Sequence, residues 1–150
     1  MNATRHGSVR LAAMVMLLAL TGAACTSGAT PAPTTINVTL QEWAVLPSAT
    51  SAAAGKITFR VNNVGPADVH EFVVIKTDLD AYALPTDATG TVSEEGIEVK
   101  GEIEDLAVGS TEDLTLELAA GHYTLICNVY SKDEKEAHYK MGMAANFTVN

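Results

Sequence analysis

Alternating apolar and polar residues form the main pattern of the chain from residue 36 onward. Residues two positions apart share one face of a β-strand, so this alternation predicts strands with one buried face. We expect strands at residues 36–43, 56–62, 69–75, 111–118, 122–129 and 145–149. Turn-forming residues separate these segments, and no long helical pattern interrupts them. The pattern therefore predicts an all-β domain that folds as a β-sandwich.

Two longer stretches between these segments lack a clear strand pattern. Residues 78–90 contain Pro85, Gly90 and several aspartates, which predicts a loop that could include a short helical turn at residues 79–84. Residues 92–108 are rich in glutamate, and such a charged run is typical of a solvated face, so we assign no site to it. Trp43, the only tryptophan, is interpreted as a core residue.

The N-terminal part of the chain resembles an export signal. A positively charged start is followed by a ten-residue apolar segment at residues 11–20, which is too short to span a membrane. Small residues then precede Cys25, so either ordinary signal cleavage or lipoprotein processing with a lipid on Cys25 is possible, and we favour the second. We therefore expect a signal peptide at 1–24, a flexible tether at 25–35 and one domain at 36–150. The protein is expected in the periplasm or on the outer face of the cell membrane.

The net charge limits the choice of partners. The full chain has a net charge of −9, and removal of residues 1–24 leaves seven basic against 18 acidic residues, a net charge of −11. Such a chain is not expected to bind nucleic acid, because the phosphate backbone would repel it.

Metal-binding side chains gather near the C-terminus. Cys127, His138, Met141 and Met143 follow one another within a short span. Thiolate, imidazole and thioether are donors that favour copper, and two histidines, one cysteine and a weak axial methionine form the blue copper site. His70 is the candidate for the second histidine. The alternative for Cys127 is a buried, unreactive thiol, although an odd cysteine in an exported protein calls for another explanation.

The two remaining histidines are less informative. His122 precedes Tyr123 on the strand that leads to Cys127. Because Tyr123 shares a face with Cys127, His122 should point the other way, and we expect it on the surface. His6 lies within the predicted signal.

Three segments resemble the cupredoxins, the plastocyanin- and azurin-like blue copper proteins. They are Asn62-Asn63-Val64-Gly65 with His70-Glu71-Phe72-Val73-Val74, Gly121-His122-Tyr123 with Cys127 four residues later, and His138-Tyr139-Lys140-Met141-Gly142-Met143. The resemblance covers roughly residues 36–150. It implies a Greek-key β-sandwich that holds one type 1 copper ion.

The resemblance also implies a ligand set. His70, Cys127 and His138 would be the equatorial copper ligands, and Met143 the axial one, with Met141 as a rival. Ten residues separate Cys127 from His138, more than the family commonly has. The extra loop length costs little, since each doubling of a flexible loop adds only about 0.6 kcal/mol. It leaves the exposure of His138 and the fine geometry of the site open.

These features together imply an extracytoplasmic one-electron carrier, not an enzyme, that cycles between Cu(I) and Cu(II). A redox protein is the expected partner, such as a basic cytochrome c or a membrane oxidoreductase, and a monomer is expected. Tyr139 and Met141 could form an apolar patch for electron exit. One alternative is a copper-binding or copper-delivery protein without redox cycling. Another is a metal-free sandwich that serves adhesion or assembly.

Overall fold

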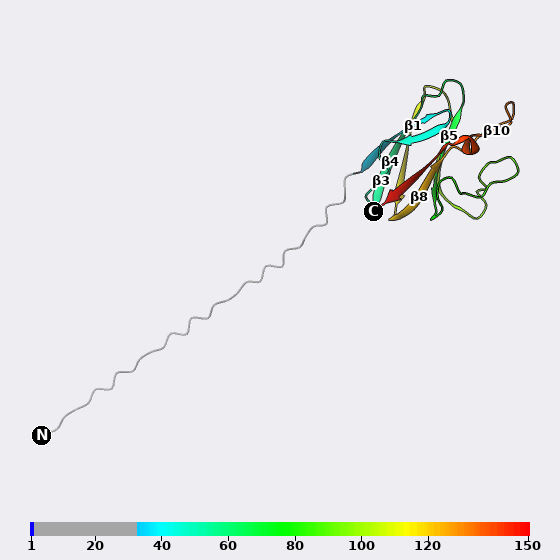
Figure 1. Cartoon of the computed structure of the whole chain (residues 1–150). Helices are drawn as coiled ribbons and strands as arrows, with labels where there is room; N and C mark the ends of the chain where they lie inside the picture. Colours follow the sequence, from blue (N-terminus) through cyan, green and yellow to red (C-terminus); the bar gives the residue numbers. More distant parts are fainter. Residues whose placement is uncertain (2–32) are drawn as a thin grey trace. The chain divides into compact units, whose positions relative to one another are not determined.

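The computed structural model describes Met1 and residues 33–150, drawn in colour in Figure 1. The predicted signal peptide beyond Met1, and Cys25, lie outside the described residues. Among the described residues, none belongs to a helix with the length and apolar character needed to cross a membrane.

The first sheet of the domain has four strands in the order β2-β1-β4-β7. Its strands are β1 (Thr34–Gln41), β2 (Ala44–Pro47), β4 (Gly55–Asn63) and β7 (Thr111–Leu118). The pair β1 and β4 is parallel, whereas β1–β2 and β4–β7 are antiparallel. On β7, Leu114, Leu116 and Leu118 are more buried than Thr115 and Glu117, as the alternation predicts.

The second sheet has five strands in the order β3-β11-β8-β5-β6. Its strands are β3 (Ser51–Ala52), β5 (His70–Lys76), β6 (Glu98–Leu106), β8 (Gly121–Ile126) and β11 (Ala144–Val149). In Figure 1 the red β11 runs beside β8. Two sheets whose successive strands pass from one to the other make a Greek-key β-sandwich, and the predicted all-β fold is confirmed.

The main core fills the space between the two sheets. Phe59 of β4 lies 5.4 Å from the ring of Phe72 on β5 and 5.5 Å from the ring of Phe147 on β11, measured between ring centroids. These aromatic contacts join both sheets in one apolar cluster that also includes Cys127 and Met143. Two of the candidate metal ligands, Cys127 and Met143, are therefore part of the close-packed core.

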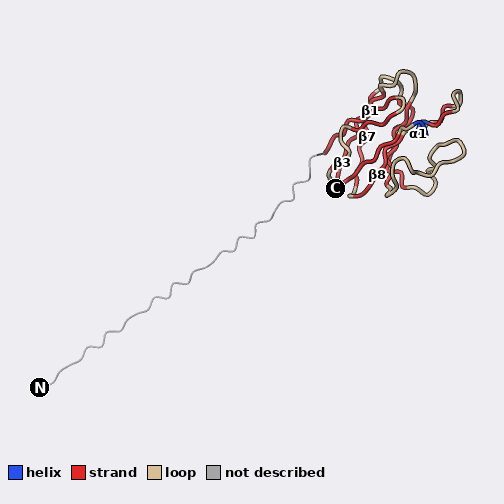
Figure 2. Tube along the Cα trace, in the orientation of Figure 1, coloured by secondary structure: helices blue, strands red, loops and turns tan. Residues whose placement is uncertain are grey.

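A second apolar cluster lies on the other face of the five-stranded sheet. Side chains of β5 and β8, such as Val73 and Ile126, pack there with Ala81, Leu84 and Tyr139. Residues 77–97 supply this cover, and Figure 2 draws them as loop, with turns but no helix at residues 79–84. Burial on both faces explains why residues 72–75 form a continuous apolar run.

Several strand bounds differ from the sequence interpretation. Strand β1 ends at Gln41 instead of residue 43, and β8 ends at Ile126 instead of residue 129. Strand β1 begins at Thr34, so two residues expected in the tether belong to the first strand. The acidic stretch 92–108 contains β6, an edge strand that pairs with β5 and interrupts the pairing with two irregularities. Charged side chains are typical of edge strands, where they discourage pairing with another chain, and they hide the apolar alternation in the sequence.

Candidate metal centre

Three elements bring His70, Cys127 and His138 together. His70 is the first residue of β5, and Cys127 directly follows the last residue of the neighbouring strand β8. His138 begins α1 (His138–Met141), the short helix that leads into β11. The pairing of Val73 with Ile126 in the sheet sets β5 and β8 in a register that places His70 and Cys127 close together. The three predicted ligand residues therefore meet although 68 positions separate His70 from His138.

The three donor atoms form a small triangle. The distances are 3.1 Å between Nδ1 of His70 and Nδ1 of His138, 3.4 Å between Sγ of Cys127 and Nδ1 of His138, and 3.8 Å between Sγ and Nδ1 of His70. A triangle with these sides has a circumradius of about 2.0 Å, close to typical metal–nitrogen distances in proteins and slightly shorter than typical metal–thiolate distances. One metal ion can therefore contact all three atoms.

Burial of the triangle controls its protonation. Cys127 and His70 are fully buried, and His138 is 1% exposed. Burial raises the pKa of the Cys127 thiol to about 12, although backbone N–H groups at Glu71 and Val129 act in the opposite direction. Burial also lowers the pKa of both histidines, and the nearby His138 lowers the pKa of His70 further. The imidazoles are consequently neutral near pH 7, which is the form that binds metal.

The two methionines near His138 have different environments. Met143 is fully buried in the main core, whereas Met141 is 41% exposed. Gly142 lies between them with a φ of 117°, a conformation that L residues with a side chain rarely adopt. This glycine ends α1 and turns the chain back into the sandwich, so Met143 and Met141 point to different surroundings.

The long segment between Cys127 and His138 forms a projecting hairpin. Strands β9 (Tyr130–Ser131) and β10 (Glu136–Ala137) pair with each other, and residues 132–135 at the tip are exposed. The N–H of His138 donates to the carbonyl of Val129 at 2.9 Å, which closes the base of the hairpin beside the site. The insertion thus leaves the donor triangle intact and His138 buried.

Tyr139 does not contribute to the surface patch that the sequence suggested. It is 4% exposed, and its hydroxyl donates to the carbonyl of Ala81 and accepts from the N–H of Leu84. The expectation of a paired Tyr139–Met141 patch was wrong, because loop 77–97 covers Tyr139. Met141 alone remains at the surface.

Two residues that the sequence did not indicate lie directly against the histidines. The indole ring of Trp43 lies 5.0 Å from the ring of His138 in an edge-on arrangement, measured between centroids. Oε1 of Glu42 lies 3.8 Å from Nε2 of His70, and the Glu42 side chain is only 10% exposed. Trp43 packs against the core as expected, but no sequence pattern signals its contact with His138.

The segment before His70 is shaped by Asn63. Its amide Nδ2 donates to the carbonyls of Asp68 and Leu106, and its Oδ1 accepts from the N–H of Gly65.

The same segment also determines the charge of Glu42. Burial alone would raise the pKa of Glu42, but hydrogen bonds from the N–H groups of Asp68 and Ala67 outweigh this effect and lower that pKa. Glu42 is therefore a carboxylate near pH 7.

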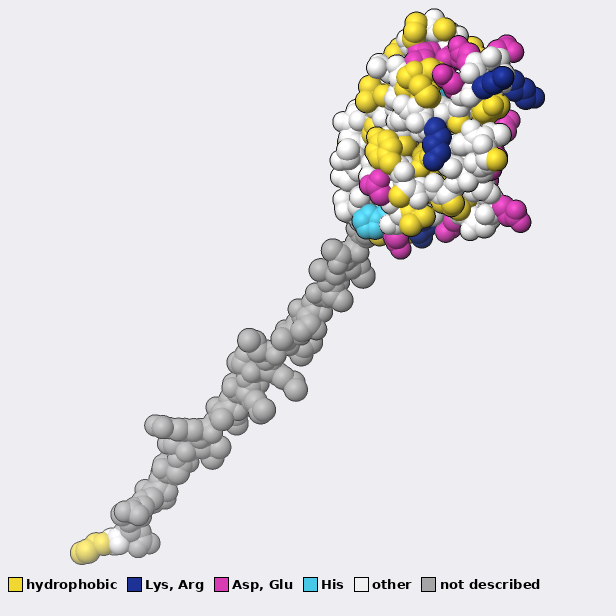
Figure 3. Space-filling view, turned by 45° about the vertical axis from the view of Figure 1, so that its right-hand side comes forward, with side chains coloured by type: hydrophobic (Ala, Val, Ile, Leu, Met, Phe, Trp, Pro, Cys, Tyr) yellow, Lys and Arg dark blue, Asp and Glu magenta, His cyan; other side chains and the backbone are white. Residues whose placement is uncertain are grey.

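An acidic cluster includes Glu71, whose backbone N–H donates to Sγ of Cys127 at 3.2 Å. One carboxylate oxygen each of Glu71, Glu94 and Glu102 lies within 4.8 Å of the other two. Burial, followed by repulsion from Glu94, Glu102 and Glu104, raises the pKa of Glu71 to about 7. Figure 3 shows acidic side chains spread over one face of the domain. The cluster makes the surface near the candidate site strongly negative.

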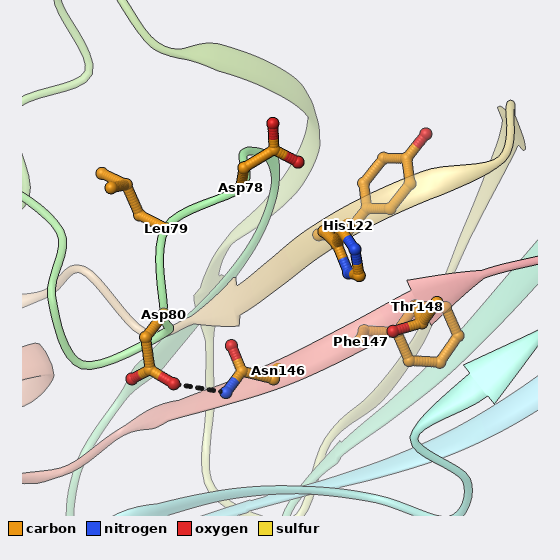
Figure 4. Close-up of a pocket in the computed structure, with 8 residues that line it drawn as sticks. Asp78, Leu79, Asp80, His122, Asn146, Phe147 and Thr148 are labelled. Atoms are coloured by element: carbon orange, nitrogen blue, oxygen red, sulfur yellow. Dashed lines mark hydrogen bonds between the residues drawn. The ribbon is translucent and has the colours of Figure 1, made fainter.

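A shallow hollow of about 270 Å³ lies elsewhere, along β8 and β11. Figure 4 shows the hydrogen bond that Asn146 donates to Asp80 at the edge of this hollow, with His122 across from them. His122 is exposed, as predicted, and within residues 33–150 it belongs to no group of convergent metal donors.

The donor set fits copper on chemical grounds. Two imidazoles and one thiolate, with a thioether nearby, are ligands that favour copper over magnesium, calcium or manganese. Nε2 of His70 and of His138 is buried and has no hydrogen-bond partner among the described residues, whereas both Nδ1 atoms face the sulfur. A β-sandwich with such a His–Cys–His group has the architecture of a cupredoxin.

Solved structures show the same fold. Auracyanin from the photosynthetic bacterium Roseiflexus castenholzii superposes with a TM-score of 0.57 and 24% identity, covering 78% of this chain and 97% of that protein. Auracyanin A, a "blue" copper protein from Chloroflexus aurantiacus, has a TM-score of 0.53 and 25% identity, covering 79% and 100%. Rusticyanin has a TM-score of 0.55 and 15% identity, covering 81% and 82%. No protein-family model and no curated protein matches the sequence significantly. The chain therefore has the cupredoxin fold.

Proposed function

We propose that the protein is a mono-copper, one-electron carrier in which His70, Cys127 and His138 hold the metal. The observation that carries this proposal is the buried triangle of two Nδ1 atoms and one Sγ atom, 3.1–3.8 Å apart. Bound copper would supply one electron by passing from Cu(I) to Cu(II), and a partner protein that accepts one electron would be reduced. The chain's own contribution is to hold three donors in a rigid core, which limits rearrangement between the two oxidation states.

Met143 is proposed as the axial ligand. It is fully buried in the core cluster that contains Cys127, whereas Met141 is 41% exposed. A buried thioether can make the long, weak contact that tunes the potential of a blue copper site. Met141 would instead lie at the surface near His138.

Burial of the donors supports electron transfer over copper delivery. A delivery protein must hand its metal to a partner, which is easier when the ligands are accessible. Here both histidines and the cysteine are almost completely buried. Electron transfer requires no open coordination position, and a site closed to substrate also favours a carrier over an enzyme.

The proposed location is outside the cytoplasmic membrane. It rests on the sequence of residues 1–24, which resembles an export signal, and on residues 25–35, which resemble a tether. A lipid on Cys25 would then anchor the domain, which would function as a monomer at the membrane surface.

A basic redox protein, such as a cytochrome c or the basic face of a membrane oxidoreductase, is the proposed partner. The acidic cluster of Glu71, Glu94 and Glu102 lies beside Cys127, and it would attract a positively charged surface to the metal site. Its effect should weaken with salt, because the carboxylates are at least partly exposed. Electron exchange with a basic cytochrome c should therefore slow as ionic strength rises.

The test of the metal site is an absorption spectrum of the domain during addition of Cu(II), followed by ascorbate. We expect an intense visible band that saturates at one copper per chain and disappears on reduction. Cys127→Ser should remove the band, because the thiolate–copper bond produces it. The matched control is His122→Gln, which changes an exposed histidine and should leave the band intact.

Two outcomes would contradict the proposal. A colourless complex would exclude a thiolate–copper redox site and would favour copper delivery if copper still binds. Equal copper binding by the parent and Cys127→Ser would favour a metal-free module with adventitious surface copper.

A further inference from the structure

The turn between β1 and β2 lies over both candidate histidine ligands. It consists of Glu42 and Trp43. Trp43 covers the ring of His138 at a centroid distance of 5.0 Å, and Glu42 approaches Nε2 of His70 to 3.8 Å. With these residues in place, His70 is 0% exposed and His138 is 1% exposed. The turn therefore separates the outer edges of both imidazoles from solvent.

Glu42 fastens this turn to the loop that precedes His70. Its Oε1 accepts hydrogen bonds from the N–H of Asp68 at 2.8 Å and from the N–H of Ala67 at 3.2 Å. This loop connects β4 to β5, whereas the turn connects β1 to β2, so these bonds link two separate parts of the chain. Hydrogen bonds to a charged acceptor are stronger than those between neutral groups.

Close contact with Gly65 supports the same link. A Cβ atom on Gly65 would lie 2.6 Å from Oε1 and 2.7 Å from Oε2 of Glu42, which is closer than atoms can approach. The loop therefore has room for the carboxylate only because residue 65 is glycine. Gly142, which follows α1, also lies near the turn: a Cβ atom there would lie 3.4 Å from the backbone carbonyl oxygen of Trp43.

The turn covers the Nε2 atoms of both histidines, which are the ring nitrogens that face away from the sulfur. A metal-bound histidine usually donates its second ring N–H to a carboxylate, a carbonyl or water. Here Nε2 of His70, Nε2 of His138 and Oε2 of Glu42 are buried without hydrogen-bond partners among the described residues. The outer edges of both imidazoles are therefore closed to bulk solvent.

We propose that Glu42 and Trp43 form a latched cover that closes the copper site to water, external ligands and chelators. In this cover Trp43 is the shield over His138, and Glu42 is a positioning residue that holds the cover on loop 64–69 and places a negative charge beside His70. The inference rests on the proposed function, because it assigns the cover to the same metal site. The cover itself is a property of the metal-free chain and can be tested without copper.

Fluorescence provides the copper-free test, since Trp43 is the only tryptophan. Trp43 is partly buried, so quenching by acrylamide should be restricted in the metal-free parent. Glu42→Ala removes the latch, and Gly65→Ala pushes the carboxylate away from the loop, so both should increase the quenching constant several-fold. Glu112→Ala on the exposed face of β7 is the matched control and should behave like the parent. Parent-like quenching in both Glu42→Ala and Gly65→Ala would overturn the latch.

Copper removal tests the shield. Trp43→Ala should lose copper to excess chelator about tenfold faster than the parent. The reason is that loss of the indole ring lowers the free energy of the local opening that exposes His138. Trp43→Phe should give an intermediate rate, and it retains the test if the alanine variant does not fold. Leu79→Ala, at an exposed apolar residue outside the site, should leave the rate unchanged. Equal rates in the parent and both Trp43 variants would overturn the shield.

Glu42→Gln separates the charge from the latch. The glutamine can still accept hydrogen bonds from Asp68 and Ala67, but it removes the negative charge beside His70. The reduction potential should shift to more positive values, because the carboxylate stabilises Cu(II) more than Cu(I). No shift, or the same shift in Glu112→Gln, would overturn the role of the charge.

Failure of the proposed function can be told apart from failure of the cover. Absence of a thiolate–copper band in the parent would reject the proposed function, and the fluorescence result would still decide the latch.

Discussion

The backbone N–H of Cys127 donates a hydrogen bond to the backbone carbonyl of Met143, with 3.0 Å between nitrogen and oxygen. This bond extends the antiparallel pairing of β8 with β11, in which Ile126 pairs with Ala144. The backbone positions of the cysteine and the proposed axial methionine are thus set by the sheet and not by the metal. A change of the Met143 side chain therefore leaves both partners of this backbone bond in place.

Met143→Gln should lower the reduction potential of the copper protein. An amide oxygen is a harder donor than a thioether and stabilises Cu(II) relative to Cu(I). Met141→Gln is the matched control and should leave the potential unchanged, because Met141 is exposed. Voltammetry of the two variants checks this. A shift in Met141→Gln alone would assign the axial position to Met141.

Copper binding should release one proton per ion near neutral pH. Burial raises the pKa of the Cys127 thiol to about 12 and lowers the pKa of His70 and of His138, so only the thiol loses a proton when metal binds. The apparent affinity should consequently rise about tenfold per pH unit above about pH 7. Calorimetry in buffers with different ionisation enthalpies measures the release. Cys127→Ser should release no proton, and a parent that releases none would show that the thiol is not a ligand.

Glu71→Gln should stabilise the metal-free protein at alkaline pH but not in acid. The pKa of Glu71 is raised from 4.5 to about 7, so the folded chain holds this proton more tightly than the unfolded chain. Its favourable contribution is complete below about pH 4.5 and is lost as the pH rises to about 7. The gain at about pH 8 should be on the order of 1 kcal/mol, because Glu71 is only partly buried and solvent screens its charge.

Urea unfolding of the metal-free variants at acid and alkaline pH measures this difference. Comparison of Glu71→Gln with the parent removes the contribution of the histidines, which both proteins share. Glu112→Gln, on the exposed face of β7, is the control and should change stability little at either pH. An equal gain at both pH values would attribute the effect to packing instead of charge.

Tyr139→Phe should destabilise the domain by about 1–3 kcal/mol while leaving the copper band unchanged. The substitution removes the hydroxyl that bonds Ala81 and Leu84, and it leaves a buried carbonyl and a buried N–H without that partner. Tyr82→Phe is the matched control, since Tyr82 is 64% exposed and water can replace its bond to Ala144. Denaturant unfolding and the visible spectrum provide the two measurements. An altered band with unchanged stability would indicate that Tyr139 acts on the metal site.

Local patterns were sufficient for most of the strands and for the types of the candidate ligands. Alternation along β4 and β7 reports which side chains face the core, because successive side chains of a strand point to opposite faces. The same local logic predicted that His122 is exposed. It failed for β6, where acidic side chains at an edge mask the alternation, and for Tyr139, which a distant loop covers.

The sequence by itself determined an all-β chain and the presence, in order, of one histidine, one cysteine, a second histidine and methionine. Only the tertiary structure decided that β5 lies beside β8, that Nδ1 of His70 and Sγ of Cys127 are 3.8 Å apart, and that Met143 is buried while Met141 is exposed. It also decided that Glu42 and Trp43 lie over the histidines. The physical reason is that side-chain periodicity depends on neighbouring residues, whereas strand pairing and burial depend on contacts between residues far apart in the chain.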